Sequence, residues 1–264
     1  MTQTPDWRDL TRFATALADA AAAAILPHFR QNTPVDVKNS IVWDPVTEGD
    51  RAGERAIRQL IEERFPEHNI HGEEYGVKDA GSPFTWVLDP VDGTRSFVFG
   101  MPTWATLIGL TYEGRPVVGV MNQPFVGDMF YGNPDGAWHN HRGAVQRIRT
   151  RRNVPLAKAA MGTTAPELYR SASDAAGFER LRHATQITRY GGDAYFFALM
   201  AAGHIDIAMD AGLQAYDIAA LLPIIAGAGG AYAEWTGGNP VNGGNIISAG
   251  SRALLDEALA VLCG

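Results

Sequence analysis

The stretch Thr85-Trp-Val-Leu-Asp-Pro-Val-Asp-Gly-Thr94 places two acids directly after a short apolar run. The apolar residues predict a strand that ends on Asp89, because Pro90 has no N–H with which to continue the hydrogen-bond ladder. Asp92 follows three residues later, and Gly93 permits a close backbone approach or a positive φ. Two carboxylates that converge at a strand end repel each other unless a cation lies between them. A divalent ion that prefers oxygen ligands, Mg²⁺ or Mn²⁺, would remove this conflict.

Asp-Gly pairs are also common in solvated turns, so the stretch alone leaves a plain turn as the alternative. Three further acidic positions favour the metal interpretation. Glu73 and Glu74 follow a short apolar stretch, Asp217 begins an apolar helix expected over 218–225, and Asp50 begins an earlier helix. Capping of those two helices remains the alternative role for Asp50 and Asp217.

Outward from the acids, hydrophobic spacing predicts a mixed α/β chain in which helices cover sheets. Helices are expected over Trp7–Arg30 and from Asp50 to Phe65, and Glu113-Gly114 is typical of a hairpin turn. The remaining expected strands are Val35–Lys38 (weak), Trp104–Thr111, Pro116–Met121, Met129–Tyr131, Ala137–Arg149, Ala159–Gly162, Thr185–Arg189, Ile205–Met209, Ala231–Trp235 and Ile246–Ala249. The remaining expected helices begin near Pro166, Asp193, Asp217 and Ser251.

Composition narrows the classes of function. The net charge of −7 gives no reason to expect affinity for nucleic acid or an anionic membrane. One cysteine, Cys263, excludes an intrachain disulfide and a four-cysteine zinc site, and is compatible with the cytoplasm, the expected location. The N-terminus lacks the pattern of a signal peptide, and the apolar stretch Ala14–Leu26 predicts a packed helix. The basic stretch Arg147–Asn153 predicts a boundary between an N-terminal half, residues 1–146, and a C-terminal half, residues 147–264.

Four motifs together resemble the inositol monophosphatase family, in the same order and at similar separations. They are Val46–Asp50, Gly72–Glu74, Asp89–Thr94 and Ala215–Ala220, and the last departs from the common form because Tyr216 stands where Trp is usual. The resemblance covers essentially the whole chain. It implies an α-β-α-β-α sandwich of the inositol monophosphatase and fructose-bisphosphatase type, a metal-dependent phosphatase of small phosphate esters, and a homodimer. The apolar segment Met101–Leu110 is a candidate for the contact between the two protomers.

The resemblance also implies the metal ligands. Glu73, Asp89 and the Val91 carbonyl would bind one ion, and Asp89, Asp92 and Asp217 a second, with a third and weaker ion near Glu73. Mg²⁺ is expected, with Mn²⁺ as an alternative. Such ion pairs hold a phosphate group and stabilise charge on the attacking and leaving oxygens. The N-terminal half would supply most of the ligands, and the C-terminal half would supply Asp217 and the substrate pocket.

The same resemblance implies the residues that act on water and phosphate. Thr94, paired with Asp50, would orient and deprotonate the attacking water, and Glu73 would assist through its metal ion. The backbone N–H groups of Gly93 and Thr94 suit phosphate oxygens. Direct hydrolysis is expected, without a phosphorylated residue.

The substrate must be chosen by residues beyond the metals. Arg95 follows the hexapeptide, Arg189–Tyr195 contains Asp193, and Asp210 lies seven residues before Asp217. Arg95, Arg189, Asp193 and Asp210 are the candidate substrate contacts, and two acids suit a positively charged substrate such as histidinol phosphate. An N-cap role for Asp193 and a surface ion pair for Arg95 are the alternatives. Segments that look like the histidinol-phosphatase branch of the family are Gly93–Phe97, Pro102–Ile108 and Ala215–Leu221.

Other functions remain open: an inositol monophosphatase, a sugar-bisphosphate or nucleotide phosphatase, or a phosphatase fold used as a regulatory binding module. His139 and His141 lie in a hairpin bounded by glycines, and their spacing would suit a metal. No carboxylate or cysteine cluster is near them in the sequence, so a solvated strand edge is expected. His71 is expected to be a hydrogen-bonded loop residue.

Overall fold

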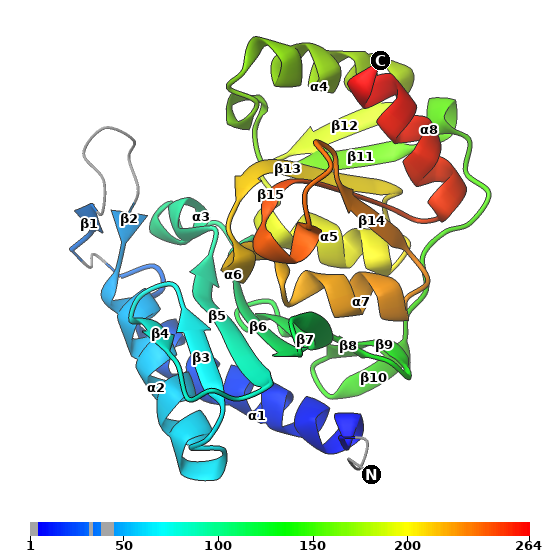
Figure 1. Ribbon diagram of the computed structural model, residues 1–264. Helices are drawn as coiled ribbons and strands as arrows, with labels where there is room; N and C mark the ends of the chain where they lie inside the picture. Colours follow the sequence, from blue (N-terminus) through cyan, green and yellow to red (C-terminus); the bar gives the residue numbers. More distant parts are fainter. Residues whose placement is uncertain (1–4, 32–33, 38–44) are drawn as a thin grey trace.

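The computed structural model describes residues 5–31, 34–37 and 45–264, and these residues form five layers (Figure 1). Helices α1 (Trp7–Ile25) and α2 (Glu48–Arg64) cover the outer face of an eight-stranded sheet. Helices α5 (Asp193–Ala201), α6 (Ala215–Ile218) and α7 (Leu221–Gly227) separate this sheet from a five-stranded one. Helices α4 (Ala172–Ala184) and α8 (Arg252–Cys263) cover the far side of the smaller sheet, which confirms the predicted α-β-α-β-α sandwich.

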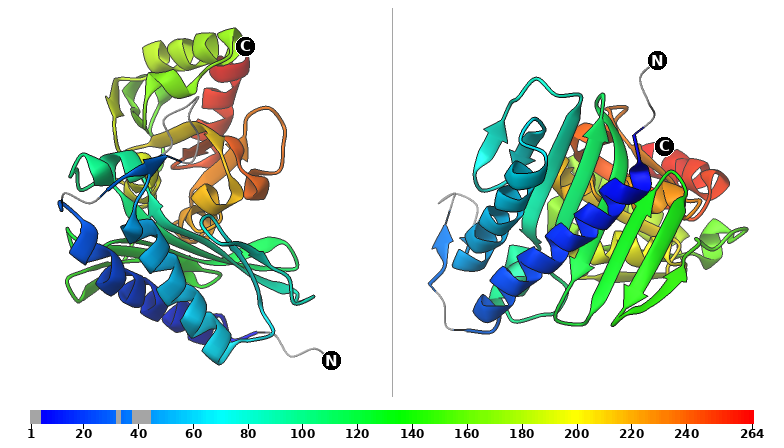
Figure 2. Two further views of the ribbon diagram at one scale, coloured as in Figure 1. Left: turned by 90° about the vertical axis from the view of Figure 1, so that its left-hand side faces the viewer. Right: turned by 90° about the horizontal axis from the view of Figure 1, so that it is seen from below.

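The large sheet has the strand order β10-β9-β8-β7-β6-β5-β3-β4, and only the β3–β5 pair is parallel. Figure 2 shows α1 and α2 lying side by side across its outer face. Its strands are β3 (Asn69–Gly72), β4 (Gly76–Lys78), β5 (Phe84–Asp92), β6 (Ala105–Tyr112), β7 (Arg115–Gln123), β8 (Asp128–Asn133), β9 (Gly136–His141) and β10 (Ala144–Arg147).

The smaller sheet has the order β12-β11-β13-β15-β14, with β12, β11 and β13 parallel and the other two pairs antiparallel. Its strands are β11 (Ala160–Thr163), β12 (Ile187–Tyr190), β13 (Ile207–Leu213), β14 (Ala231–Glu234) and β15 (Gly244–Ala249). The smaller elements are β1 (Asp36–Val37), β2 (Pro45–Val46), α3 (Thr94–Val98) and the 3₁₀ turns Leu26–His28, Leu156–Lys158, Pro166–Leu168 and Pro240–Asn242. The division into 1–146 and 147–264 stays a prediction.

Most predicted elements are present, and the differences have local causes. The first α-helix ends at Ile25 instead of Arg30, since the chain tightens into a 3₁₀ turn that contains Pro27. The helix predicted over 217–227 is broken into α6 and α7. Pro223 explains the break, because it cannot donate the hydrogen bond that a continuous helix would make to Ala219. Strand β5 passes through Pro90 to Asp92, which corrects the expectation that it ends on Asp89.

Two further expectations, one for a strand and one for a dimer contact, are modified by the structure. The weak strand expected at Val35–Lys38 is a two-residue strand, Asp36–Val37, paired with Pro45–Val46; Lys38 lies outside the described residues. Of the segment proposed for a dimer contact, Ala105–Leu110 is buried in the chain's own sheet, while Met101 is exposed. A contact through this segment is therefore limited to its first residues.

Helix α1 and the turn after it, Trp7–His28, are long and apolar enough to cross a membrane by length and composition. In the fold, however, its apolar face packs on the large sheet, where Leu10, Phe13 and Leu17 are buried with Trp86. The sequence-based expectation of a packed helix is thus confirmed.

Helices α6 and α7 approach the other face of the large sheet unusually closely. Gly109, Gly119 and Gly132 are cross-strand neighbours on β6, β7 and β8 and form a row without side chains, here called the glycine row. A Cβ atom on Gly119 would lie 1.8 Å from the carbonyl oxygen of Ala220, and one on Gly132 would lie 2.5 Å from that of Pro223. The helical segment therefore rests directly on the strand backbone.

Alanine at each position of the glycine row should destabilise the protein, and the loss of stability should be larger where the added Cβ atom lies closer to the opposing backbone. Gly119→Ala (1.8 Å) should cost most, Gly132→Ala (2.5 Å) less, and Gly109→Ala (2.9 Å from the Ala219 carbonyl carbon) least. Overpacking of this kind costs about 1–3 kcal/mol or somewhat more. Urea unfolding of the three variants measures the order. The exposed variant Val145→Ala serves as the control, and equal stability of all three glycine variants would contradict the close contact.

Candidate metal and active site

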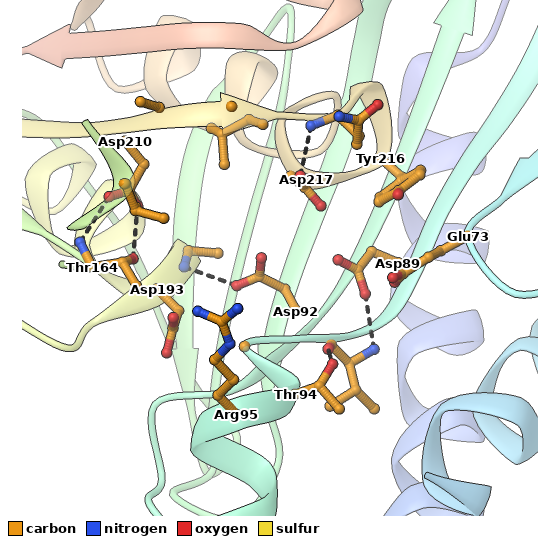
Figure 3. A pocket seen from close by; sticks show the side chains of 18 of the residues that line it. Glu73, Asp89, Asp92, Thr94, Arg95, Thr164, Asp193, Asp210, Tyr216 and Asp217 are labelled. Carbon is orange, nitrogen blue, oxygen red and sulfur yellow. Dashed lines mark hydrogen bonds between the residues drawn. The ribbon is translucent and has the colours of Figure 1, made fainter. Parts of the chain in front are cut away.

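The parallel pairing of β3 and β5 brings the first two acids together. Gly72 and Leu88 are register partners, and the Glu73 N–H donates to the Leu88 carbonyl at 3.1 Å. Glu73 and Asp89, the next residue on each strand, therefore emerge side by side at the same sheet edge. Figure 3 shows both carboxylates directed toward the cavity described below.

Glu54, a buried residue of α2, fixes the turn that carries Glu73. Its Oε2 accepts from the N–H of Glu74 at 2.7 Å, and its Oε1 accepts from the N–H of Tyr75 at 3.1 Å and from Arg58 Nε at 2.7 Å. A Cβ on Gly72 would lie 1.9 Å from Glu54 Oε1, so only glycine fits there. Glu54 was not predicted from the sequence, because Glu74, whose N–H it binds, lies twenty residues further along the chain.

An irregularity in β5 directs Asp89 and Asp92 to one site. Asp89 pairs with Leu107 of β6, and Asp92 pairs with Ala105 of the same strand. The regular pairing of β5 with β6 is therefore interrupted between Asp89 and Asp92, as expected around Pro90. The N–H of Val91 donates to Asp89 Oδ1 at 3.0 Å, and the N–H of Ala194 on α5 donates to Asp92 Oδ2 at 2.9 Å. Both carboxylates are thereby held by backbone groups.

Asp217 reaches the same site from the helical layer. It is the third residue of α6, and its Oδ2 accepts from the N–H of Gln214 at 2.6 Å in a capping box. Capping and metal binding are thus compatible, because the cap uses only one of the two oxygens. One oxygen each from Asp89, Asp92 and Asp217 lie within 4.8 Å of one another, a spacing that fits ligands of a common ion.

Asp50 and Thr94 form the predicted pair beside the carboxylates. Asp50 is the third residue of α2, and Thr47 is the N-cap, which corrects the expectation that Asp50 caps this helix. Asp50 Oδ2 accepts from the N–H and the hydroxyl of Thr47 at 2.8 and 2.6 Å. The Thr94 hydroxyl lies 3.3 Å from Asp50 Oδ1 and 3.0 Å from the Val91 carbonyl oxygen. Gly93 has φ = 77°, the positive φ that its position required.

Burial raises the pKa of three acids of this site, Asp89, Asp92 and Asp217. It acts together with the charges of Glu73, Asp92 and Asp217 to raise the pKa of Asp89 well above its usual range. Burial raises the pKa of Asp217 to about 7, although the Gln214 N–H opposes this shift. Burial also raises the pKa of Asp50, although the hydrogen bonds from Thr47 act in the opposite direction. A cluster that resists ionisation in this way is stabilised by a bound cation.

The donor set fits the divalent metal that the sequence predicted. The available ligands are carboxylates and one carbonyl, all hard oxygen atoms, and no histidine or cysteine is among the described residues that line the cavity. Mg²⁺ and Mn²⁺ prefer this set. Glu73, Asp89 and the Val91 carbonyl, and Asp89, Asp92 and Asp217, are the groups that would hold the ions.

A cavity of about 550 Å³ opens above the acids. Asp193 and Asp210 line it on the side opposite Glu73 and Asp89 (Figure 3). Arg95 also lines it, from the exposed face of α3. Arg189, predicted to contact the substrate, lies on the exposed strand β12 and outside the cavity lining.

Arg170 lines the cavity although sequence reasoning did not select it. It lies in the connection between the 3₁₀ turn Pro166–Leu168 and α4, where no motif or periodicity marks it. An arginine near a phosphate site is a useful signal only once the fold shows that its segment borders the cavity.

Asp193 and Asp210, on the side of the cavity opposite Glu73 and Asp89, already accept hydrogen bonds from groups of the protein. Asp210 Oδ1 accepts from the Thr163 hydroxyl at 2.8 Å and from the N–H of Thr164 at 2.7 Å, and Oδ2 accepts from the Thr164 hydroxyl at 2.8 Å. Burial raises the pKa of Asp210 to about 7 despite these bonds. Asp193 begins α5 and its Oδ2 accepts from the Ser96 hydroxyl at 2.6 Å, so it is not an N-cap.

The layered fold and its oxygen-lined site define a metal-dependent phosphatase class. A comparison with known protein families matches residues 6–263 to the inositol monophosphatase family. The chain belongs to that family and is a phosphatase of the family's type.

Three similar proteins illustrate the range of substrates within the family. An inositol monophosphatase structure from Zymomonas mobilis is 37% identical, covers 98% of this chain and 99% of its own, and has a TM-score of 0.85. The bifunctional phosphatase IMPL2, chloroplastic, of Arabidopsis thaliana is 35% identical over 96% of this chain and 76% of its own length. A histidinol-phosphatase of Streptomyces coelicolor is 33% identical and covers 98% of both chains.

The raised pKa values predict how Mg²⁺ affects stability with pH. A folded acid with a raised pKa keeps a proton that the unfolded chain releases, so the metal-free protein loses stability as pH rises from about 4 to about 7. Mg²⁺ should therefore raise Tm more at about pH 8 than at about pH 5.5, where protons compete for the same oxygens. Thermal unfolding with and without Mg²⁺ measures this difference, which Asp217→Asn should reduce. An equal Mg²⁺ effect at both pH values would contradict the assignment.

Proposed function

We propose that the protein is a Mg²⁺-dependent phosphomonoesterase whose substrate is L-histidinol phosphate, which it hydrolyses to L-histidinol and phosphate as a step of histidine biosynthesis. The supporting observation is one cavity with two unlike sides. Three converging carboxylates and the Thr94–Asp50 pair lie on one side, and Asp193 and Asp210 lie on the other. We further propose that it acts in the cytoplasm, as a homodimer, with two or three ions at each site.

When bound, the Mg²⁺ ions would neutralise phosphate charge and make a water molecule more acidic. Residues of this chain would then transfer the proton of the attacking water and hold the accepting group in place. Thr94 Oγ1 accepts a proton from the attacking water while its own hydroxyl proton passes to Asp50 Oδ1. The Thr47 hydroxyl and N–H hold the other Asp50 oxygen, so the accepting carboxylate keeps its orientation. The water oxygen bonds to phosphorus as the bond from phosphorus to the ester oxygen breaks, and the leaving oxygen takes up a proton from a solvent water molecule.

The phosphate and the leaving group meet different groups of the cavity. The backbone N–H groups of Gly93 and Thr94 and the Arg95 guanidinium are proposed to contact phosphate oxygens. Asp193 and Asp210 are proposed to face the ammonium and imidazole groups of histidinol phosphate, for which a buried carboxylate is the best partner. Arg189 would take part only with a substrate that extends past the cavity lining.

The inositol monophosphatase alternative rests on the likeness to the Zymomonas mobilis protein. A polyol would hydrogen-bond to the same acids, but without the gain from opposite charge. A sugar-bisphosphate or nucleotide phosphatase is the broader alternative. A regulatory binding module would have no need for the Thr94–Asp50 pair, whose retention favours an enzyme.

Removal of one charge from the metal ligands should nearly abolish turnover. Asp89→Asn and Asp92→Asn each weaken ion binding, so we expect kcat to fall by about three orders of magnitude or more while the fold is kept. Phosphate release measures the loss, and circular dichroism checks the fold. Near-normal turnover in either variant would rule out the two-ion site. The variant Asp174→Asn, at a half-buried position outside the cavity lining, removes an equal charge and is the control.

A substrate panel tests the assignment to histidinol phosphate. It compares kcat/KM for histidinol phosphate, inositol 1-phosphate, fructose 1,6-bisphosphate and adenosine 3′,5′-bisphosphate in Mg²⁺. Histidinol phosphate should rank first. Asp193→Asn should then raise its KM by about 10- to 100-fold, the value of one charge-assisted hydrogen bond.

The same variant should leave the KM for inositol 1-phosphate nearly unchanged. Glu167→Gln, an exposed acid beside the cavity-lining Leu168, is the matched control and should change neither value. A different best substrate would refute the histidinol phosphate assignment and leave the phosphatase assignment intact.

A further inference from the structure

A second group of potential metal ligands lies away from the carboxylate centre, where the sequence predicted a solvated edge. The structure contradicts that expectation for His139, whereas His141 is exposed as expected. His139 and His141 lie on β9, which is covered on its outer side by β10, and the His139 side chain is only 15% exposed. Asp128 on β8 is the direct cross-strand partner of His141. A carboxylate thirteen residues away along the chain is thus brought between the two rings.

The three side chains direct their ligand atoms to one point. His139 Nε2 lies 2.7 Å from Asp128 Oδ1, and His141 Nδ1 lies 2.8 Å from the same oxygen. All three atoms lie within 4.8 Å of one another. In a tetrahedral site with bonds near 2.0–2.1 Å, ligand atoms are about 3.3 Å apart. Small side-chain rotations would therefore open enough room for an ion.

The ligands are themselves held in place, as metal ligands usually are. The Tyr195 hydroxyl of α5 donates to Asp128 Oδ2, which leaves Oδ1 facing the rings. The His139 ring stacks on Phe130 with centroids 4.3 Å apart and planes at 6°. Its Nδ1 lies 3.5 Å from the Gln146 side-chain amide. These contacts fix the ring so that Nε2 points to Asp128.

We propose that Asp128, His139 and His141 form a second metal site, which binds a divalent transition-metal ion such as Zn²⁺. Two imidazoles and one carboxylate suit Zn²⁺, Co²⁺ and Ni²⁺, whereas Mg²⁺ prefers the oxygen ligands of the active-site cavity. None of the three residues lines that cavity. The His141 side chain is 48% exposed, so water can reach the ion and complete its coordination. The site does not depend on the proposed substrate.

The site connects the large sheet to the first turn of α5, because Tyr195 of that helix donates to Asp128 of β8. Tyr195 contacts Asp128, while the preceding residue, Ala194, donates its N–H to Asp92. An ion at the second site would therefore stabilise the β8–β9 hairpin together with the helix turn that touches the active site. Asp128, His139 and His141 line none of the four cavities described for this structure, so the proposed role of the ion is structural.

Co²⁺ binding in saturating Mg²⁺ tests this proposal, because Mg²⁺ occupies the oxygen ligands and Co²⁺ bound to imidazole absorbs visible light. The wild-type protein should bind one Co²⁺ per chain by equilibrium dialysis and show this absorption, and Zn²⁺ should displace it. His141→Asn should weaken binding by more than about 100-fold, and Tyr195→Phe, which loosens Asp128, by about 10- to 100-fold. Asp217→Asn should leave the Co²⁺ site unchanged.

The absence of Co²⁺ uptake by the wild-type protein would overturn the proposal. So would Co²⁺ binding that survives His141→Asn or disappears in Asp217→Asn, since the ion would then belong to the carboxylate centre. His141 is half-exposed, so its variant should fold, and the Tm in Mg²⁺ checks this. Mg²⁺-dependent phosphate release should be unchanged in His141→Asn, so failure of the second site is distinguishable from failure of the proposed function.

Discussion

The contact between the α6–α7 segment and the glycine row is the constraint on which the active site depends. Asp217 belongs to the helical layer, whereas Glu73, Asp89 and Asp92 belong to the large sheet. When the proposed ligands come from two layers, the packing between the layers determines how precisely the ligands are positioned relative to one another. Since the backbone of Ala219 and Ala220 rests on the backbone of Gly109 and Gly119, no side chain separates the two layers at this contact. The distance from Asp217 to the sheet is thereby fixed.

A second constraint is that two of the acids proposed for the active site also cap a helix. Asp50 and Asp217 are both third residues of a capped helix, and in each the Oδ2 atom satisfies the cap. The remaining oxygen can face a proton or a cation at no cost to the helix. This arrangement orients the carboxylates before any ion binds. It also places them where burial and mutual repulsion raise their pKa values, so that a cation is strongly preferred over solvent.

The sequence predicted the features that arise from local chemistry. Helical periodicity located α1 and α2, Glu113-Gly114 located a hairpin, and the acidic motifs located Glu73, Asp89, Asp92 and Asp217. What escaped prediction depends on cross-strand register or on docking. Glu54 acts on residues twenty positions away, and Arg170 borders the cavity only because of how its turn packs.

The two histidines of β9 show the same limit most clearly. Their spacing along the strand is visible in the sequence, but the register that sets Asp128 opposite His141 is not. A single-residue slip would place Asp128 on the other face of the sheet, away from both rings. Sequence proximity is therefore a poor test for metal ligands in an antiparallel sheet, where strand pairing brings the third ligand.

The architecture also explains why overall identity does not decide the substrate. The proposed metal ligands belong to the large sheet and α6, while Thr164, Asp193 and Asp210 come from the smaller sheet and the start of α5. The side of the cavity proposed for the leaving group can therefore change its hydrogen-bonding groups without moving the carboxylates proposed to bind the metal ions. Family members named for inositol phosphate and for histidinol phosphate can thus resemble this chain about equally. We propose that discrimination between the two substrates comes from charge on the far side of the cavity. There, buried acids held by threonine and serine hydroxyls keep an arrangement that a cationic substrate can recognise.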